Sequence, residues 1–547
     1  MCGIFSVIYH KLGLYPNFTS SHKKLIRRGP DNNCTIIYDN NLYCIQFSFY
    51  RLSINDKSAI GNQPFSFANL HLICNGEIYN HNEIKRIYNI KTVSNSDCEV
   101  ILPLYYKLLE QSKPQEAIER LCNVLDGEFA FIIYDKINDI IISARDKMGV
   151  RPLFYGTYYV NYENKQYTNI ALASEIKALD FCGYVEPFMP ATYLIIKYDG
   201  VNPIVSFEKY YNMIDKIIKI DFSQLIVEKV NYFLTQAVKK RIMNTEADLC
   251  CLLSGGLDSS LCTAIASREL KKTGRKLKTF SIGLENSTDL ACADIASKFI
   301  GTEHTSIVKT KEEFINSIPD VIRAIESYDT TTVRASVGNY LVGKYIREHS
   351  EIKVVLNGDY SDEVCGGYMY MRNANEKEFE EETFRLLKDI YLFDSLRSDR
   401  CISSNGLEPR TPFSDPEFIE CYLSIPIKIR MDNSIMEKFI LRKAFENDKL
   451  LPDNILWRKK EAFSDGVSSI NDSWHNIIKL FIESKVSNEE FENRNELFPF
   501  NTPQLKETFY YRKIFEELYP KRSNIIPYYW LPKFNGNIID PSARELN

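Results

Sequence analysis

Residues 249–270 read LCCLLSGGLDSSLCTAIASREL, an apolar run followed by a turn with two adjacent glycines and a run with helical character. This order predicts a β-strand, a loop and an α-helix, the unit from which parallel sheets are built. Two more apolar strands are predicted within residues 278–284 (KTFSIGL) and 353–359 (KVVLNGD), with helical patterns between them. The C-terminal part is therefore expected to be an α/β domain that binds ligands at the carboxyl edge of its strands.

The turn from Ser254 to Ser260 has the chemistry of a phosphate cradle. Glycines let the backbone approach a phosphate, hydroxyl groups donate to its oxygens, and the N-terminus of a helix favours an anion. The turn differs from a Walker A loop because it has no lysine and lacks the four-residue spacer. A glycine turn capped by serine and aspartate is the ordinary alternative, but the complete SGGLDSS sequence directly after a strand favours the cradle.

The first 200 residues have a different pattern, in which short apolar, β-branched and aromatic runs alternate with turn residues. The runs at residues 33–40 (NCTIIYDN) and 129–146 (FAFIIYDKINDIIISARD) are typical of strands in hairpins. Helical spacing predicts one helix within residues 97–111. The first part is therefore expected to be an α+β domain.

The sequence pattern changes after this α+β region. An amphipathic helix is predicted at residues 225–241, and residues 488–503 are polar and acidic enough to predict a loop. We expect two domains, which comprise residues 2–200 and 201–547. A chain of 547 residues is longer than one hydrophobic core usually serves.

The composition excludes several classes of protein. The chain has 67 basic and 72 acidic residues and a formal net charge of -5, which argues against a nucleic-acid partner or an anionic membrane partner. Its 14 cysteines are too sparse for a disulfide scaffold, and they form no CxxC pair that would indicate a zinc site. No leader and no run of about 18 apolar residues is evident, so we expect a cytoplasmic protein.

Cys2 is a candidate nucleophile. Removal of Met1 would leave a cysteine with both a thiol and a free α-amine. An α-amine has a reference pKa of about 8, so a useful fraction is neutral near pH 7 and can accept the thiol proton. The alternative is a small residue that simply begins a strand.

Five motifs accompany Cys2: CGIF, YRLSI around Arg51, NGEIYN from Asn75, SNSD ending at Asp97, and ARDKMGVRPLFY. Together they resemble the class II, amino-terminal-nucleophile glutamine amidotransferase domain. The resemblance implies that Cys2 attacks the glutamine amide, and that Asn75 and Gly76 form the catalytic oxyanion hole. It also implies that Arg51 binds the α-carboxylate and Asp97 the α-ammonium of glutamine. The implied glutamine-binding residues are Arg51, Leu52, Ser53, Ile54, Asn55, Asn75, Gly76, Glu77 and Asp97.

SGGLDSS is the motif of ATP-pyrophosphatase enzymes. With KVVLNGDYSDEVCGGYMY (353–370) and KKEAFSDG (459–466), among other motifs, it extends the likeness over essentially the whole chain, which resembles the glutamine-hydrolysing asparagine synthetases. The resemblance implies an N-terminal sandwich of two antiparallel sheets between helices, then an α/β ATP-pyrophosphatase domain with a parallel sheet and extra helices. The implied ATP-binding residues are Leu252, Ser254, Gly256, Asp258, Ser259, Ile282, Asn357, Gly358, Asp362 and Lys460. Asp258 is also the expected ligand of Mg²⁺.

The resemblance implies a specific reaction. Glutamine is hydrolysed to glutamate and ammonia, ATP activates aspartate as β-aspartyl-AMP, and ammonia converts this intermediate to asparagine with release of AMP and pyrophosphate. Unprotonated ammonia favours delivery through a water-poor passage. The expected partners are therefore glutamine, aspartate and ATP, and a homodimer is compatible with the family.

One loop departs from the family pattern. The family usually has SGEGSDE where this chain has NGDYSDE at residues 357–363, so Asp359 replaces a glutamate and Tyr360 replaces a glycine. The shorter side chain retracts the carboxylate, and a misplacement of about 1 Å can cost roughly 10²-fold in rate. We expect Asp359 to remain catalytic because the other motifs are intact.

Three alternatives remain, of which the first and the third rest on this departure. The first is a synthetase with weakened or retuned acceptor chemistry. The second is a β-lactam-forming synthetase, against which Cys2 and the glutamine-binding motifs weigh because ring closure needs no ammonia. The third is a catalytically silent regulatory protein that binds ATP or glutamine.

Overall fold

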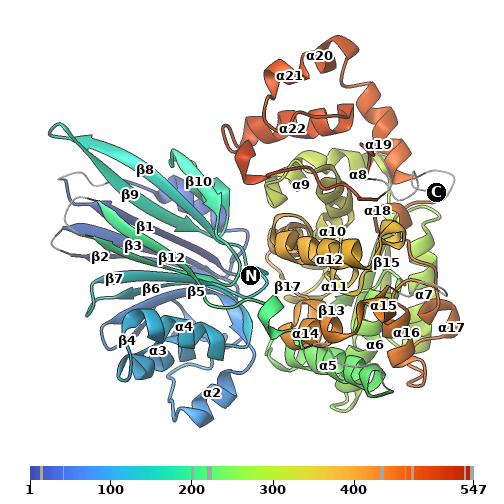
Figure 1. Ribbon diagram of the computed structural model, residues 1–547, viewed down its shortest axis with the longest axis horizontal. Coiled ribbons are helices and arrows are strands. Elements are labelled where there is room, and N and C mark those ends of the chain that lie inside the picture. The colour runs from blue at the N-terminus through green and yellow to red at the C-terminus, as the bar shows by residue number, and fades with distance from the viewer. Residues whose placement is uncertain are drawn as a thin grey trace. The chain divides into compact units, whose positions relative to one another are not determined.

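The computed structural model describes residues 1–12, 16–40, 42–198, 202–218, 224–431, 436–461, 463–469, 473–534 and 538–541. The chain forms two compact units, whose elements are labelled in Figure 1. The first comprises Met1–Asn212 with Asn244–Ala247, and the second comprises Met213–Met243 with Asp248–Asn547. No described helix is both long and apolar enough to cross a membrane.

The first unit contains two six-stranded antiparallel sheets, as predicted. Their strand orders are β10-β8-β9-β1-β3-β2 and β12-β11-β7-β6-β5-β4. The first sheet consists of β1 (Gly3–His10), β2 (Asn32–Asp39), β3 (Tyr43–Arg51), β8 (Phe154–Tyr162), β9 (Lys165–Ala173) and β10 (Tyr184–Pro187). The second consists of β4 (Phe65–Phe67), β5 (Leu70–Ile78), β6 (Gly127–Asp135), β7 (Ile140–Arg145), β11 (Thr192–Tyr198) and β12 (Pro203–Lys209).

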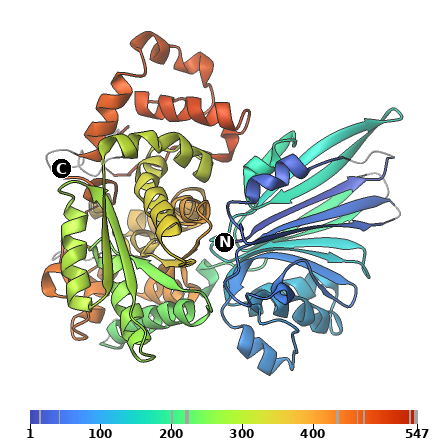
Figure 2. The same cartoon turned by 180° about the vertical axis from the view of Figure 1, so that it is seen from behind.

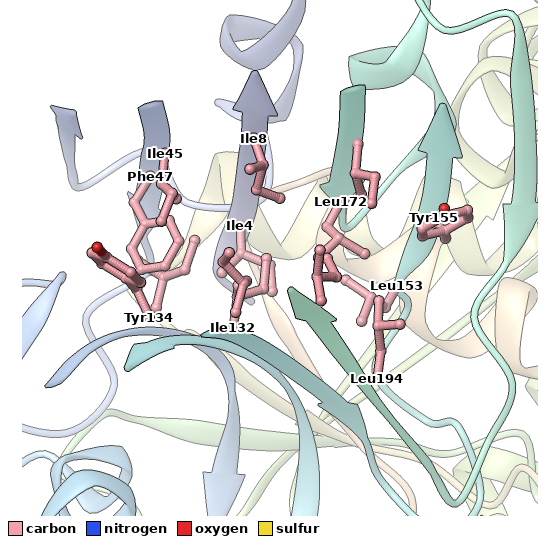
Figure 3. Close-up of a cluster of buried hydrophobic side chains, with 14 of the residues drawn as sticks. Ile4, Ile8, Ile45, Phe47, Ile132, Tyr134, Leu153, Tyr155, Leu172 and Leu194 are labelled. Carbon is pink, nitrogen blue, oxygen red and sulfur yellow. The ribbon is translucent and has the colours of Figure 1, made fainter. Parts of the chain in front are cut away.

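The two sheets pack face to face around an apolar core (Figure 3). Ile4 and Ile8 of β1 point toward Ile132 of β6 and Leu194 of β11, and all four are at most 3% exposed. All eight residues of β1 are buried, which explains why its sequence GIFSVIYH is almost continuously apolar. This packing fixes the start of the chain beside the centre of the first sheet.

Helices flank the sandwich. The described helices of this unit are α1 (Thr19–His22), α2 (His81–Ile87), α3 (Ile101–Leu109) and α4 (Pro114–Val124). The elements α3 and α4 pack against strands of the second sheet (Figure 1). The helix predicted within residues 97–111 is confirmed, although it begins as a 3₁₀ turn at Asp97–Val100.

The second unit contains a five-stranded parallel sheet of order β15-β14-β13-β16-β17, which confirms the predicted α/β class. Its strands are β13 (Leu249–Leu252), β14 (Lys278–Leu284), β15 (Glu303–Lys309), β16 (Val354–Leu356) and β17 (Glu408–Arg410). Because β16 ends at Leu356, the loop that follows it lies at the carboxyl edge of the sheet, where ligands bind in such folds.

Many helices surround this sheet (Figure 2). Helices α6, α7 and α10 pack against its strands, and α5 packs on α6. Their bounds are α5 (Gln224–Met243), α6 (Leu257–Lys271), α7 (Thr288–Ile300), α8 (Lys311–Asn316), α9 (Ile318–Ile325), α10 (Thr330–His349), α11 (Ser361–Cys365), α12 (Glu376–Asp389) and α13 (Cys401–Ser403). The remaining ones are α14 (Pro416–Ser424), α15 (Ile427–Arg430), α16 (Phe439–Phe445), α17 (Asp453–Leu456), α18 (Phe463–Gly466), α19 (Trp474–Glu483), α20 (Asn488–Glu492), α21 (Arg494–Leu497) and α22 (Lys506–Leu518). The predicted helix at residues 225–241 corresponds to α5.

The prediction of a loop at residues 488–503 is wrong for its first half, which forms α20 and α21. The side chain of Ser487 accepts a hydrogen bond from Glu490 N and so caps α20. Phe491 packs edge-on against Phe509 of α22, with 5.9 Å between the ring centroids. A cap and one apolar anchor are enough to hold a short exposed helix whose composition is mostly polar.

Candidate active sites

Cys2 directly precedes β1 and is held through its backbone. Its carbonyl oxygen accepts a hydrogen bond of 3.0 Å from Nε of Arg28, whose Nη1 donates to Glu175 at 2.9 Å. Both of these side chains are buried. The Cys2 thiol lies 3.8 Å from the carbonyl oxygen of Leu52. Arg28 and Glu175 were not predicted, because neither belongs to a motif that the sequence marks.

Asn75 and Gly76 lie side by side on β5. Asn75 is fully buried, and neither its Nδ2 nor its Oδ1 has a hydrogen-bond partner among the described residues. A buried amide without partners is costly unless a ligand satisfies it. At Gly76 a Cβ would lie 2.7 Å from the carbonyl oxygen of Glu128 on β6, so the close approach of the strands requires glycine. The pair therefore offers hydrogen-bond donors at a fixed position.

Glu77 and Asp97 form an acidic pair bridged by one amide. Nδ2 of Asn55 lies 3.1 Å from both Glu77 Oε2 and Asp97 Oδ1, and the other oxygen of Asp97 accepts from Ile78 N at 2.6 Å. The structure thus brings together three predicted glutamine-binding residues that are far apart in sequence. Two carboxylates at one place suit an ammonium group.

Arg51 ends β3 and is oriented by the loop that follows. Its Nη1 donates to the carbonyl oxygen of Ser58 at 2.8 Å and to Oδ1 of Asn62 at 2.6 Å. Its Nη2 donates to the carbonyl oxygen of Asp56. The guanidinium is therefore fixed by loop residues. Arg51 as a whole is 5% exposed.

The remaining residues of this predicted set lie between Arg51 and Asn55. Leu52, Ser53 and Ile54 are buried, and the backbone N-H of Ser53 donates to Asp31 Oδ2 at 2.8 Å. This short segment carries the Leu52 carbonyl to the Cys2 thiol and Asn55 to the acidic pair. The segment therefore connects the surroundings of the Cys2 thiol with the acidic pair of Glu77 and Asp97.

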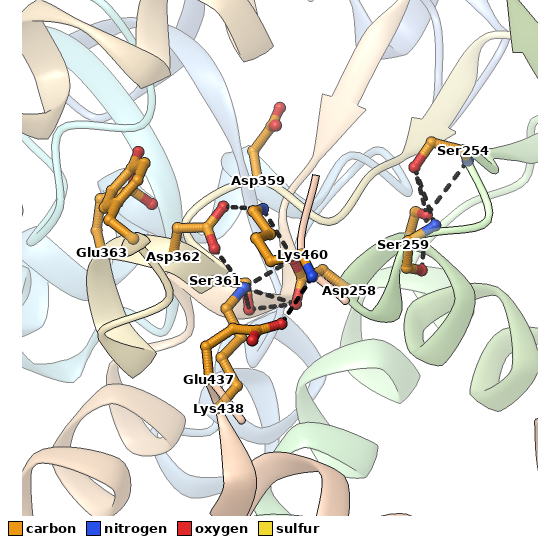
Figure 4. Close-up of polar contacts among 12 residues, drawn as sticks. Ser254, Asp258, Ser259, Asp359, Ser361, Asp362, Glu363, Glu437, Lys438 and Lys460 are labelled. Carbon is orange, nitrogen blue, oxygen red and sulfur yellow. Dashed lines mark hydrogen bonds and ion pairs between the residues drawn. The ribbon is translucent and has the colours of Figure 1, made fainter. Parts of the chain in front are cut away.

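The SGGLDSS motif begins in the loop after β13, and its last four residues form the first turn of α6, so it joins a strand to a helix as predicted (Figure 4). The hydroxyl groups of Ser254 and Ser259 are 3.0 Å apart, and Ser254 N donates to Ser259 Oγ at 3.2 Å. Gly255 has φ +73°, and a Cβ there would lie 2.4 Å from the backbone of Cys292. The backbone N-H groups of the first turn of α6 have no helical acceptor of their own, which suits an anion.

A second loop packs against this turn. A Cβ at Gly358 would lie 2.7 Å from Ser259 N, so the two loops touch through glycine. Ser361 donates to Asp258 Oδ1 at 2.7 Å. The two loops together form one wall of a cavity.

Two lysines connect the acidic residues of these loops (Figure 4). Nζ of Lys438 is 2.8 Å from both oxygens of Asp258 and 2.6 Å from Asp362 Oδ1, and its side chain is 1% exposed. Nζ of Lys460 lies 2.5 Å from Asp362 Oδ2. Burial alone would raise the pKa of Asp362, but the two lysine charges outweigh it and hold this pKa well below its usual value. Lys438 was not predicted, since no local spacing marks it.

These groups line a cavity of about 830 Å³ in the second unit. Its lining includes the predicted residues Leu252, Ser254, Gly256, Asp258, Ser259, Asn357, Gly358, Asp359, Asp362 and Lys460, together with Lys438. Ile282 is not among the described lining residues; it is 2% exposed on β14. A cavity of this size accommodates a small-molecule ligand.

Asp359 faces the cavity and is held by Arg397. Nη2 of Arg397 lies 2.5 Å from Asp359 Oδ1 and 3.2 Å from Asp394 Oδ1. Burial raises the pKa of Asp359, and the charge of Arg397 opposes this effect. Oδ2 of Asp359 has no hydrogen-bond partner among the described residues. One oxygen of this carboxylate is therefore anchored by Arg397, and a side-chain hydrogen bond with Ser398 also counteracts the rise of its pKa.

Tyr360 adopts a conformation that usually favours glycine. Its φ is +77°, it is 1% exposed, and its hydroxyl group shares a hydrogen bond with Ser395. The substitution of tyrosine for the usual glycine is thus accommodated by burial of the ring and by a partner for its hydroxyl group.

Comparisons with known proteins agree with this arrangement. Residues 1–211 match the glutamine amidotransferase domain family, and residues 229–378 and 371–531 match the asparagine synthase family. The "Asparagine synthetase [glutamine-hydrolyzing]" of Rattus norvegicus is 40% identical, and the alignment covers 100% of this chain and 98% of the relative. A "Probable asparagine synthetase [glutamine-hydrolyzing]" of Acanthamoeba polyphaga mimivirus is 41% identical over 100% of both chains. The Homo sapiens relative is 38% identical, with coverage of 100% and 98%. These names give no support to the alternative of a weakened or retuned synthetase.

Proposed function

Because the chain belongs to the family of glutamine-hydrolysing asparagine synthetases, we propose that it uses ATP to transfer the amide nitrogen of glutamine to aspartate. The products are asparagine, glutamate, AMP and pyrophosphate. The observation that carries this proposal is the match of both parts of the chain to the family over its whole length. The two sets of residues described above supply the chemistry that each half-reaction needs.

In the glutaminase half-reaction, Cys2 is the nucleophile after removal of Met1. Its α-amine accepts the thiol proton, the thiolate attacks the amide carbon of glutamine, and this proton leaves with ammonia as the C–N bond breaks. Water then hydrolyses the thioester to glutamate. The buried Asn75 amide without a described partner and the N-H of Gly76 would stabilise the oxyanion. The Arg28 hydrogen bond supports the position of the Cys2 backbone.

The other glutamine-binding residues hold the amino-acid end of the substrate. Glu77 and Asp97 would bind the α-ammonium group, and Arg51 the α-carboxylate. Because Arg51 already donates to loop atoms, we infer that the substrate carboxylate takes up its remaining donor capacity or displaces one of these contacts.

In the synthetase half-reaction, the β-carboxylate of aspartate attacks the α-phosphorus of ATP and pyrophosphate leaves. Hydroxyl and N-H groups of the SGGLDSS turn would hold the phosphate oxygens. The ammonium groups of Lys438 and Lys460 lie at the same cavity wall and would balance the negative charge of the departing pyrophosphate.

Asp258 and Asp362 fit a magnesium site. Their carboxylates meet at one position, which the ammonium of Lys438 contacts, so the donor set already binds a cation there. Mg²⁺ is usually bound by one or two carboxylates together with substrate phosphates. These two residues would hold the ion, which when bound would neutralise charge on the phosphate oxygens. Among the described residues no group of three or more potential protein ligands occurs, so phosphate oxygens and water would complete the coordination.

In the amination step, ammonia attacks the activated carbonyl carbon and AMP leaves. The unpartnered Oδ2 of Asp359 is suited to accept a hydrogen bond from ammonia and then the proton that the new amide loses. Arg397 fixes the other oxygen and so aims this carboxylate.

The cytoplasmic location, the homodimer and the assignment of the two half-reactions to residues 2–200 and 201–547 stay predictions. A purified-protein assay tests the function itself. With ATP, Mg²⁺ and aspartate, the protein should form asparagine and pyrophosphate from either glutamine or ammonia, as measured by chromatography. The C2A variant should lose the glutamine-driven reaction and keep the ammonia-driven one. Glutamine-driven synthesis by C2A, or retention of Met1 on the active protein, would contradict the proposal.

A further inference from the structure

The first compact unit contains a short segment from much later in the chain, Asn244–Ala247. The helix α5 precedes this segment directly and belongs to the second unit, and so does β13, which begins two residues after it. These four residues therefore pack with the first unit, although the chain on both sides of them belongs to the second.

The contribution is a hydrogen bond to a predicted glutamine-binding residue. Nδ2 of Asn244 donates to Oε2 of Glu77 at 2.8 Å. The same oxygen accepts from Nδ2 of Asn55 at 3.1 Å, and Asn55 also contacts Asp97. A chain of contacts therefore runs from Asn244 through Glu77 and Asn55 to Asp97.

Glu77 depends on these donors because it is buried. Its exposed fraction is 3%, and a carboxylate that loses a charge-assisted hydrogen bond in such a place shifts its orientation or its ionisation. The amide of Asn244 is half-buried and donates to the same oxygen of this carboxylate as the amide of Asn55.

We propose that Asn244 is a positioning residue for glutamine hydrolysis, which fixes the Glu77 carboxylate for the α-ammonium group of glutamine. The proposal rests on the function proposed above. It makes glutamine binding depend on a segment that directly follows α5 in the chain.

The end of α5 is firmly held within the second unit. Arg241, three residues before Asn244, donates to Asp415 at 3.0 Å, and its carbonyl oxygen accepts from Arg410 of β17. The strand β17 pairs with β16, whose carboxyl end leads into the loop of Asp359. The starting point of the Asn244 segment is thus fixed by the sheet that carries the synthetase residues.

Three variants of the full-length protein test the proposal. In N244A the KM for glutamine should rise roughly 10-fold, the scale of one lost hydrogen bond to a charged group, while kcat changes less. In N244D the KM should rise further, because a second carboxylate faces Glu77. If Asn244 had only a structural role, there would be no reason for N244D to have a higher KM than N244A. The matched control is N231A on α5, the helix that precedes Asn244. Asn231 Nδ2 contacts Ala444 O at 2.8 Å and Asp448 Oδ2 at 3.0 Å, both in the second unit.

Ammonia-driven asparagine synthesis serves as the internal reference and should be unchanged in all three variants. The proposal fails if the KM of N244A stays within about 2-fold of the wild-type value, less than a lost hydrogen bond to a charged group predicts. It also fails if N244D is no worse than N244A, or if N231A raises the KM equally. These results differ from failure of the proposed function, in which the wild-type protein itself would form no asparagine from either nitrogen source.

Discussion

Replacing Lys438 with methionine should destabilise the second unit and stop the ATP-dependent half-reaction. The ammonium group of Lys438 is buried between the carboxylates of Asp258 and Asp362, at 2.8 Å and 2.6 Å. Methionine keeps much of the apolar stem but removes the charge, so two carboxylates that are 16% and 19% exposed lose the cation between them. The variant therefore isolates the electrostatic part of this cluster.

The structure sets the magnitude of this effect. Breaking a buried ion pair by removing one partner costs about 3–5 kcal/mol. Lys460 remains 2.5 Å from Asp362 and Ser361 remains 2.7 Å from Asp258, so both acids keep one donor. We therefore expect the low end, about 3 kcal/mol in the free energy of unfolding. The control is K428M, because Lys428 is 79% exposed and 3.8 Å from its partner Glu376, and an exposed pair contributes less than about 1 kcal/mol.

Tryptophan fluorescence measures this change in the right part of the molecule. The three tryptophans of the chain, Trp457, Trp474 and Trp530, all belong to the second unit. Urea unfolding followed by their emission gives the free energy of unfolding by linear extrapolation. Pyrophosphate release with aspartate and ammonia should be lost, whereas glutaminase activity should persist. A loss of stability below about 1 kcal/mol, the level of an exposed pair, or unchanged pyrophosphate release, would refute the reasoning.

Three further predictions concern single side chains. N75A should lower the glutaminase kcat roughly 10²-fold or more while ammonia-driven synthesis stays intact, since one oxyanion donor is lost; a smaller, parallel loss in both assays would contradict this role. Y360F leaves the buried Ser395 hydroxyl group without its partner and should lower the urea stability of the second unit by about 1 kcal/mol, and no change would exclude the contact as stabilising. The pKa of Asp362 is lower in the folded than in the unfolded state, so its ionised form contributes stability that is complete above its unfolded pKa and is lost as the pH falls through the folded pKa. Between pH 5 and about pH 3 the tryptophan-detected stability should therefore decline less in D362N than in the wild type, and equal slopes would contradict this assignment.

Most of the fold could be predicted from local patterns. The alternation of strand and helix around residues 249–270 predicts the parallel sheet, and the short apolar runs of the first 200 residues predict the hairpins of the sandwich. The prediction at residues 488–503 was wrong because the polar composition indicates a loop, whereas the Ser487 cap begins a helix there. Phe491 is held by Phe509, and a contact of that kind between separate helices leaves no periodic signal in a short polar segment.

The candidate sites divide in the same way. Ser254 and Ser259 could be predicted because a phosphate cradle is built from neighbours in sequence. Lys438 could not, since it reaches Asp258 across 180 residues, and Asn244 reaches Glu77 across 167. A lysine or an asparagine alone has no spacing that distinguishes a buried partner from a solvated side chain. These partners become visible only when the fold brings distant parts of the chain together.

The loop at residues 357–363 shows how a departure from a family pattern can be absorbed by neighbours. A left-handed backbone at a residue other than glycine costs roughly 1–3 kcal/mol, and Tyr360 offsets part of this by burying its ring and bonding Ser395. Arg397 binds the shortened carboxylate of Asp359 at 2.5 Å, and Asp359 is among the residues that line the cavity. An aspartate can therefore present one aimed oxygen from a loop whose path the tyrosine fixes. The two substitutions are best understood as one unit, since Arg397 anchors the Asp359 carboxylate while the buried Tyr360 fixes the backbone beside it.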